Sequence, residues 1–365
     1  MRPRLRSTSP RWLLALLLAP GLACRAEEDF PAAQSFELDG FHLYTDFDEA
    51  VCAGTLPYLQ AQRDRIVAIV GRDDPFKMYW ARDGYPGCPF GRDDCTTRSD
   101  DGIAIYSDLQ AASHEMAHAL LARLGTPAPW LIEGTATMLE DGEPYYIPPK
   151  GTEDPGAPDV LFSAATSDDV FYADAARFTR YIAQKLGLAG FLELYAASNE
   201  GGEDPWAAGR RASVVAEHLG VDVETLEADY AAARPTFERH PNFACAYSPI
   251  AWSSGPAPAL HFEATGACDE PWTVGPIFTD AGGTAYIIGA RFDVPETANY
   301  DLTLSDEVRL TACTQDPLEP QPGFNGTLSR GAHTMQLTAG AWQFTSRVGG
   351  PVDPALTVDI ELAGP

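Results

Sequence analysis

SHEMAH, residues 113–118, contains two histidines four positions apart with a glutamate between them. On a helix, residues four apart lie on one face, so His114 and His118 can direct two imidazoles at a single divalent metal ion. Glu115 lies one step round the helix, where its carboxylate would stand beside the open position of that metal. This spacing is typical of a zinc hydrolase, and we predict that the helix binds one zinc ion.

The residues before and after the motif place it in the middle of a helix that follows a strand. GIAIY, residues 102–106, is short, apolar and rich in isoleucine, which predicts a strand. Ser107 or Asp108 can then cap a helix whose apolar residues recur at helical spacing as far as Gly125. Further upstream we expect a hairpin around Asp39-Gly40, a helix over 48–70 and a strand over 76–81.

A second helix is predicted over residues 128–142, APWLIEGTATMLEDG. Pro129 suits its first turn, and the prolines there permit a tight turn that sets this helix antiparallel to the first. Such a turn would bring Glu133 opposite His118, which makes Glu133 the candidate third metal ligand. Glu140, about two turns further on, is the alternative ligand.

HEMAH followed by WLIEGTA resembles the pattern of the gluzincin metallopeptidases, a peptidase-MA-like group with a thermolysin-like catalytic domain. The resemblance implies His114, His118 and Glu133 as ligands of one catalytic Zn²⁺ and Glu115 as the general base. It also implies an α+β fold, in which a small sheet is followed by a helical half. Many relatives carry an acid four residues after the ligand glutamate, where it supports a ligand histidine. Thr137 stands there in this chain, so its hydroxyl could accept the imidazole N–H but supplies no charge.

Helical periodicity continues after this pair of helices and predicts the helical half of the domain. Relatives often place a tyrosine or histidine of this half near the open metal position, and Tyr172 is our candidate donor to the oxyanion. Packing at the rim of the site would explain this tyrosine equally well. The predicted helices cover residues 171–186, 188–197, 206–219 and 223–233.

The composition changes at Pro241, after which Pro, Gly, Thr and Ser increase and apolar residues alternate. We therefore assign residues 36–240 to the zinc peptidase domain and 241–365 to an all-β sandwich domain. The latter resembles the small jelly-roll-like prepeptidase C-terminal domains that follow secreted bacterial peptidases. Within the first domain, residues 82–101 predict an irregular, disulfide-held loop. The strand candidates of the sandwich are 285–289, 290–294, 300–304, 308–312, 334–337, 342–346 and 356–362.

Residues 1–23 are predicted to be a signal peptide, because four arginines precede an apolar run too short to cross a bilayer. Cys24 follows directly and resembles the lipidated cysteine of bacterial lipoproteins, so the chain is either anchored by lipid at Cys24 or simply secreted. Residues 24–35 would form a tether. Both alternatives place the mature protein outside the cytoplasm, in the medium or in a bacterial cell envelope.

Charge and cysteine content agree with export. Removal of the leader takes away four arginines and no acid, which moves the formal net charge from −27 to −31 and argues against nucleic acid as a partner. Besides Cys24, six cysteines remain and could form three disulfides, with Cys88 and Cys95 as the expected local pair and Cys245, Cys268 and Cys313 sharing the C-terminal part. The sequence contains no Cys-x-x-Cys pair, which is the spacing that would indicate a second metal site.

Together these features predict an exported zinc-dependent peptidase that acts as a monomer on a peptide or protein substrate. Zinc would lower the pKa of a bound water towards about 7, and Glu115 would take a proton from that water as it attacks the peptide carbonyl. The strand over 102–106 would pair with the backbone of the substrate. Two alternatives remain open: a catalytically impaired envelope binding module with a vestigial metal site, and a hydrolase of a non-peptide amide.

Overall fold

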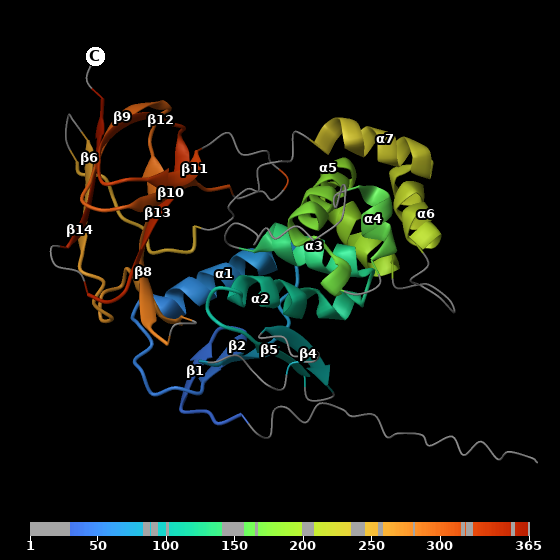
Figure 1. The fold of residues 1–365 in the computed structure, drawn as a ribbon, viewed down its shortest axis with the longest axis horizontal. Helices are drawn as coiled ribbons and strands as arrows, with labels where there is room; N and C mark the ends of the chain where they lie inside the picture. The colour runs from blue at the N-terminus through green and yellow to red at the C-terminus, as the bar shows by residue number, and fades with distance from the viewer. Residues whose placement is uncertain are drawn as a thin grey trace, which may run out of the picture.

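The chain folds into a helix-covered sheet, a helical half and an all-β part, which together form an α+β arrangement (Figure 1). The computed structural model describes residues 30–82, 88, 94–99, 102–140, 157–164, 167–198, 208–234, 245–254, 258–279, 282–314, 318, 324–351 and 355–363. The predicted leader and Cys24 lie outside these residues, so both stay predictions. None of the described helices has the length and apolar character needed to cross a membrane.

The first sheet contains five strands in the order β1-β2-β3-β5-β4. The three central strands run parallel, and an antiparallel strand flanks them on each side. Because side chains alternate along a strand, Phe76, Met78 and Trp80 share the face that packs against the helices, whereas Tyr79 faces away. The strands are β1 (Gln34–Leu38), β2 (Phe41–Thr45), β3 (Phe76–Trp80), β4 (Cys95–Ser99) and β5 (Gly102–Tyr106).

Two predictions for this sheet are wrong. The irregular loop expected over residues 82–101 contains β4, whose sequence CTTRS lacks the apolar alternation that marks a strand. Strand β5 was expected to offer a free edge to the substrate, but it pairs with β3 on one side and with β4 on the other. Among the described strands, the edge nearest the motif helix therefore belongs to β4.

Most helices match the predicted periodicity, with differences at their ends, but no helix was predicted over Pro158–Ser163. Asp108 lies before the motif helix α2, where its Oδ1 accepts the backbone N–H groups of Gln110 and Ala111. Helix α5 is interrupted at Gly187, which has a φ of 69° and separates the two predicted helices. The helices are α1 (Thr55–Val70), α2 (Ala112–Leu121), α3 (Pro129–Leu139), α4 (Pro158–Ser163), α5 (Tyr172–Ala197), α6 (Ala208–Leu219) and α7 (Val223–Ala233), with 3₁₀ turns η3 (Ala122–Leu124) and η4 (Ser167–Asp169).

The motif helix α2 lies between the sheet and α3, and α3 packs in turn against α5. Trp130 and Leu131, predicted to be buried, are each 1% exposed. Gly134 lets α3 approach α5 closely, since a Cβ there would lie 2.4 Å from Thr179 Oγ1 and 2.7 Å from the Ala175 carbonyl oxygen. The position of α3 relative to α2 therefore depends on a residue without a side chain.

The C-terminal part consists of two antiparallel sheets, with strand orders β11-β10-β13-β8-β7 and β12-β9-β14-β6. Apolar side chains from both sheets form one core, in which Phe262 of β6 contacts Phe344 of β13 at a ring-centroid distance of 4.9 Å. The sheets thus pack as a sandwich. The strands are β6 (Ala259–Ala264), β7 (Thr273–Phe278), β8 (Thr284–Val294), β9 (Ala298–Leu304), β10 (Val308–Ala312), β11 (Asn325–Leu328), β12 (Gly331–Leu337), β13 (Gly340–Val348) and β14 (Leu356–Leu362).

One strand of the sandwich differs from prediction for a physical reason. Residues 285–289 and 290–294 were predicted as two strands separated near Gly289, but they form the single strand β8. Gly289 does not end a strand; a Cβ there would lie 2.6 Å from the ring of Tyr247, so the glycine admits that ring. Strands β6, β7 and β11 were not predicted.

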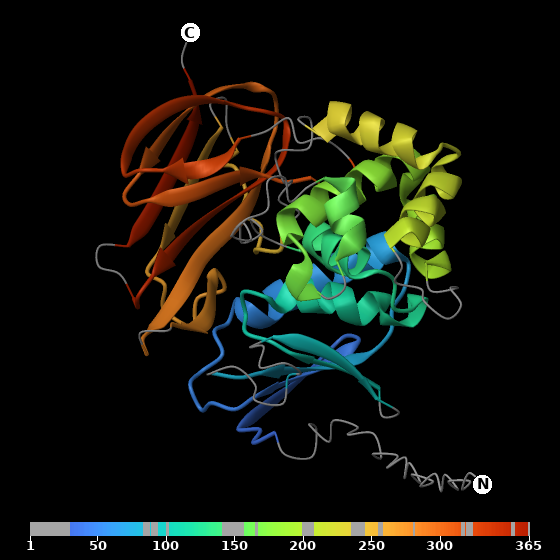
Figure 2. The same ribbon diagram turned by 45° about the vertical axis from the view of Figure 1, so that its right-hand side comes forward.

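The sandwich is joined to the start of α1 by a seam, which we define as residues 52–55 against residues 268–275. Cys52 forms a disulfide with Cys268, and the backbone N–H of Gly54 donates to the carbonyl oxygen of Thr273 at 3.0 Å. These bonds involve Cys52 and Gly54, which lie within the helix predicted over residues 48–70. Helix α1 begins directly after them, at Thr55. Figure 2 shows the sandwich, in orange and red, beside the helical half.

The disulfides agree with the cysteine count. Cys88–Cys95 is the predicted local pair, and Cys245–Cys313 lies within the C-terminal part. Cys268 was expected to pair within that part too, but it crosses to Cys52. Three disulfides are typical of a protein that folds in an extracellular or envelope compartment.

Gly134→Ala is expected to destabilise the protein by about 1–3 kcal/mol, because the added methyl group overpacks the contact between α3 and α5. Urea unfolding followed by circular dichroism would measure the change. The control is Gly190→Ala in α5, where the nearest atom to an added Cβ is Leu186 Cβ at 3.2 Å. An unfolding midpoint for Gly134→Ala as high as that of the control would contradict the packing argument.

Candidate metal centre

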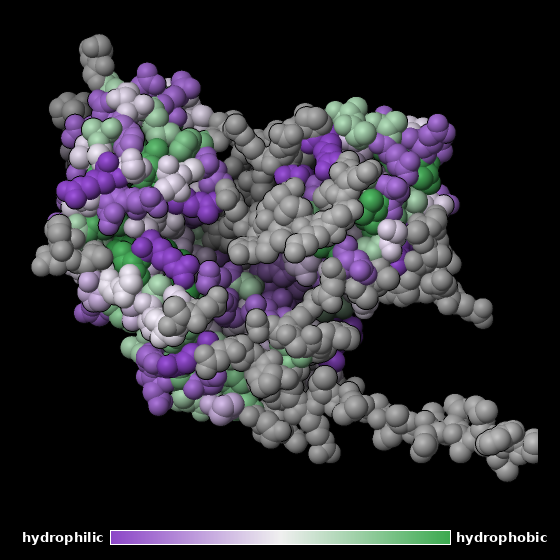
Figure 3. Space-filling model, in the orientation of Figure 1, coloured by the Kyte–Doolittle hydropathy of each residue, from purple (hydrophilic) through white to green (hydrophobic). Residues whose placement is uncertain are grey.

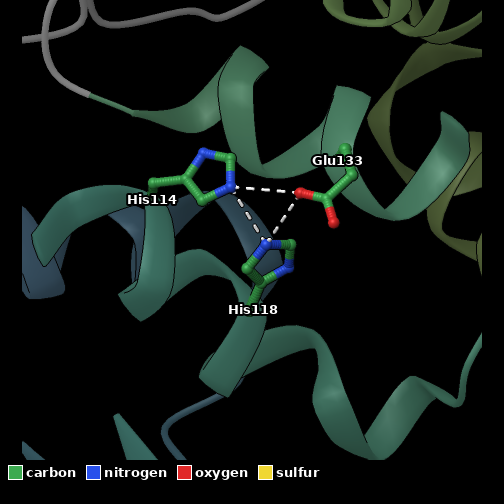
Figure 4. A group of neighbouring side chains, drawn as sticks. All are labelled: His114, His118 and Glu133. Atoms are coloured by element: carbon green, nitrogen blue, oxygen red, sulfur yellow. Dashed lines mark hydrogen bonds and ion pairs between the residues drawn. The ribbon is translucent and has the colours of Figure 1, made fainter. Parts of the chain in front are cut away.

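Two helices bring three ligand atoms together (Figure 4). His114 and His118 project from α2, and Glu133 projects from the neighbouring helix α3. The two Nε2 atoms lie 3.0 Å apart, and Glu133 Oε2 lies 3.2 Å from each of them. The antiparallel return of α3 therefore produces the predicted arrangement, and this buried group could hold a metal ion.

The protonation of His114 shows why a cation suits this place. Its Nδ1 lies 2.8 Å from Glu140 Oε2, and since a carboxylate can only accept, Nδ1 must carry the proton. In the neutral ring Nε2 is then unprotonated and directs its lone pair at Glu133 Oε2, which is also an acceptor. Acceptors facing one another in a buried space repel unless a proton or a metal cation lies between them.

The spacing of the three atoms fits a tetrahedral metal such as zinc. Bonds of about 2.0–2.2 Å place two ligand atoms of a tetrahedral site about 3.3–3.5 Å apart. The observed separations of 3.0–3.2 Å are within a few tenths of an ångström of these values.

Electrostatics couple the histidines to the surrounding carboxylates. Burial alone would lower the pKa of His114, but its contacts with Glu133 and Glu140 outweigh burial and hold that pKa well above its usual value. Burial would raise the pKa of Glu133, but the charge of His118 and the hydrogen bond with His114 hold it well below its usual value. The site attracts positive charge, and metal would compete with protons for it.

Glu115, the candidate general base, is 6% exposed on the same helix. Its Oε2 accepts a hydrogen bond of 2.7 Å from Thr96 Oγ1, which is also 3.1 Å from the Glu115 carbonyl oxygen. Nearby, burial raises the pKa of Asp94 to about 6, and the charges of Asp108 and Glu115 add to this rise. Strand β4 therefore fixes the carboxylate of Glu115 in a partly buried, acidic environment.

Tyr172 lies where the first turn of α5 meets the site. Its ring stacks on that of His114, with centroids 5.5 Å apart and an interplanar angle of 3°. Asp174 accepts hydrogen bonds from Arg177 and Arg234 and so ties this turn to the end of α7. The structure thus brings Tyr172 to His114, and its predicted role as oxyanion donor stays a prediction.

Thr137 and Glu140 do not have the roles at the site that were predicted for them. Thr137 is fully buried, and its hydroxyl oxygen has no hydrogen-bond partner among the described residues, so it does not support a histidine. Glu140, the alternative ligand, binds the outer nitrogen of His114 and is not one of the three convergent atoms.

Sequence reasoning missed two side chains at this site. Thr96 gave no signal, because it was placed in an irregular loop. Tyr195 of α5 is 2% exposed; burial raises its pKa, and the charge of Glu133 adds to the rise, so its hydroxyl stays protonated beside the metal-binding group. Its helical spacing indicated only a core residue.

Comparison with known proteins leaves the family open. No family model matches the chain, and no curated protein matches it. Among solved structures, it is similar to apo-HppE (TM-score 0.13, 11% identity, 50% of this chain and 89% of that one). It is similar to the hydroxypropylphosphonic acid epoxidase from S. wedmorenis to the same degree (TM-score 0.13, 11% identity, 58% of this chain and 100% of that one). Likeness this weak carries no argument about fold or function.

Proposed function

We propose that the protein is an exported, zinc-dependent peptidase of the gluzincin type, with a thermolysin-like catalytic domain. The observation that supports it most is the convergence of His114, His118 and Glu133, with Glu115 buried on the same helix as the two histidines. A purely structural metal site would be closed by a fourth protein ligand, whereas three ligands leave a position for water or substrate. No fourth ligand atom joins this group among the described residues.

Zinc in this site would supply a Lewis acid and make a water molecule acidic near neutral pH. The side chains of the protein would hold and move the proton. Glu115 accepts the proton of the attacking water and returns it to the nitrogen of the leaving amine. Thr96 keeps the Glu115 carboxylate in one orientation through its 2.7 Å hydrogen bond. Tyr172, whose ring stacks on that of His114, would donate to the oxyanion.

The edge of β4 is the proposed binding place for the substrate backbone. This strand ends the sheet on the side of α2, and its Thr96 touches Glu115 directly. An extended peptide that pairs with the outer edge of β4 would therefore lie next to the general base. Main-chain pairing of this kind favours peptides over other amides, because it uses the regular spacing of backbone N–H and C=O groups.

Export and anchoring complete the proposal. The three disulfides support folding in an oxidising compartment. The signal peptide over residues 1–23 and the lipid at Cys24 rest on sequence alone. If Cys24 is lipidated, the protein acts at a bacterial envelope; if it is not, the protein is released.

The alternative, an envelope binding module with a vestigial metal site, loses its main support. That alternative was suggested in part because Thr137 stands where relatives carry an acidic residue. In this structure Glu140 supplies a carboxylate to His114. In Figure 3 hydrophilic and hydrophobic residues are interspersed over the coloured surface, and among the described residues Leu362 is the exposed large hydrophobic side chain, at 44% exposure. These residues thus offer no broad apolar surface for a partner protein.

Purified protein is expected to bind one equivalent of Zn²⁺ and to lose it to a chelator. Glu133→Gln should weaken zinc binding by more than about 100-fold, since changes even to residues outside the ligand set cost 10–100-fold. Competition with a fluorescent zinc indicator measures the dissociation constant. Glu193→Gln, an exposed change on α5, is the control, and equal zinc affinity in both variants would refute the ligand assignment.

Glu115→Gln is expected to retain zinc yet lose hydrolysis of a denatured, fluorescently labelled protein by about 10²–10⁴-fold, because the amide cannot accept the proton. The wild-type activity should disappear with chelator and return with zinc. Full activity of a zinc-loaded Glu115→Gln variant would contradict the proposed mechanism. Zinc-loaded wild-type protein without turnover would favour the binding module.

Thr96→Val is expected to lower kcat about 10-fold with little change in KM, because the Glu115 carboxylate loses its charged hydrogen bond, worth about 1.5–3 kcal/mol. Thr96→Ser keeps the hydroxyl and should restore most of the activity. The exposed substitution Thr303→Val in β9 serves as the control for the chemical change. If Thr96→Ser is as impaired as Thr96→Val, the hydroxyl does not position the base.

A further inference from the structure

Glu140 lies where the chain leaves α3, at the C-terminal cap of that helix. Its backbone is extended, with φ −69° and ψ 159°, directly after the last helical residue, Leu139. Its carboxylate is only 16% exposed and accepts the His114 Nδ1 proton at 2.8 Å. The imidazole of His114 is therefore held between two carboxylates, Glu133 on one nitrogen and Glu140 on the other.

Helix geometry explains how one element supplies both carboxylates. Glu140, the residue that ends α3, follows Glu133 by seven positions, which is close to two turns of a helix, so its side chain begins on the face that carries Glu133. Thr137 lies one turn after Glu133 on that face, fully buried and without a partner for its hydroxyl among the described residues. The carboxylate at Glu140 reaches the histidine, whereas the hydroxyl at Thr137 does not.

We infer that Glu140 is the positioning residue of the metal centre: it fixes the tautomer and orientation of His114 so that Nε2 is free to bind metal. This inference rests on the metal site proposed above. The 2.8 Å hydrogen bond from His114 Nδ1 to Glu140 Oε2 determines which nitrogen of His114 carries the proton. The same bond restrains rotation of the imidazole ring. Glu140 does not touch the substrate or the metal.

Glu140 also completes the charge of the site. Two neutral imidazoles and Glu133 leave a divalent ion with an excess charge of one in a buried space. Glu140, on the outer nitrogen of His114, would offset part of that excess and so would raise the affinity for the metal. Thr137 could not do so with any orientation of its hydroxyl.

The competing explanation is that Glu140 only ties the end of α3 to α2. Glu140→Ala removes the hydrogen bond and the charge, whereas Glu140→Gln keeps an acceptor oxygen and removes only the charge. Thr137→Val, which preserves shape and burial, is the matched control on the same face. Circular dichroism and urea unfolding of the zinc-free proteins report the structural role separately from metal binding.

We expect the zinc dissociation constant to rise about 10–100-fold in Glu140→Ala and several-fold in Glu140→Gln, and to stay unchanged in Thr137→Val. The visible spectrum of the cobalt-substituted protein should also change in both Glu140 variants but not in the control. Folded Glu140→Ala and Glu140→Gln proteins with wild-type zinc affinity and cobalt spectrum would overturn the inference. Wild-type protein that binds no zinc would instead refute the proposed function itself, and this inference with it.

Discussion

Three acceptor atoms that face one another in a buried space are the constraint on which the structure depends. His114 Nε2, His118 Nε2 and Glu133 Oε2 lie 3.0–3.2 Å apart, a spacing that is unfavourable without a proton or a metal ion between them. Folding must therefore hold these atoms together against their repulsion. The layered packing does so: the sheet supports α2, α2 supports α3, and α5 closes the far side of α3.

Each support acts through a specific contact. Gly134, next to Glu133, allows α3 and α5 to approach until a Cβ would collide with the backbone of Ala175. Thr96 reaches from the sheet to Glu115, so strand β4 and helix α2 keep a fixed relation. The disulfide Cys88–Cys95 holds the start of that strand. The disulfide Cys52–Cys268 secures α1, which packs beside α2, to the sandwich.

The sequence predicted the features that depend on local spacing. The distance between His114 and His118, and the proline turn that returns Glu133, are properties of a few neighbouring residues. The α+β class and the boundaries of most helices were predicted for the same reason. Features that depend on distant parts of the chain were not: β4 has no apolar alternation, and the pairing of β5 on both sides needs the whole sheet. Gly289 was misread because the ring it admits, Tyr247, is far away in sequence.

Under the proposed function, Glu140 would take a role that the family pattern gives to another position in the sequence. A position-by-position comparison with gluzincins finds Thr137 where an acid is expected, which suggests a weakened site. The physical requirement is a carboxylate on the outer nitrogen of His114, and any residue on the same face of α3 that reaches that nitrogen can satisfy it. Glu140 lies two turns from Glu133 and meets the requirement at 2.8 Å. A departure from a family pattern therefore indicates loss of function only after the neighbouring turns of the same helix have been considered.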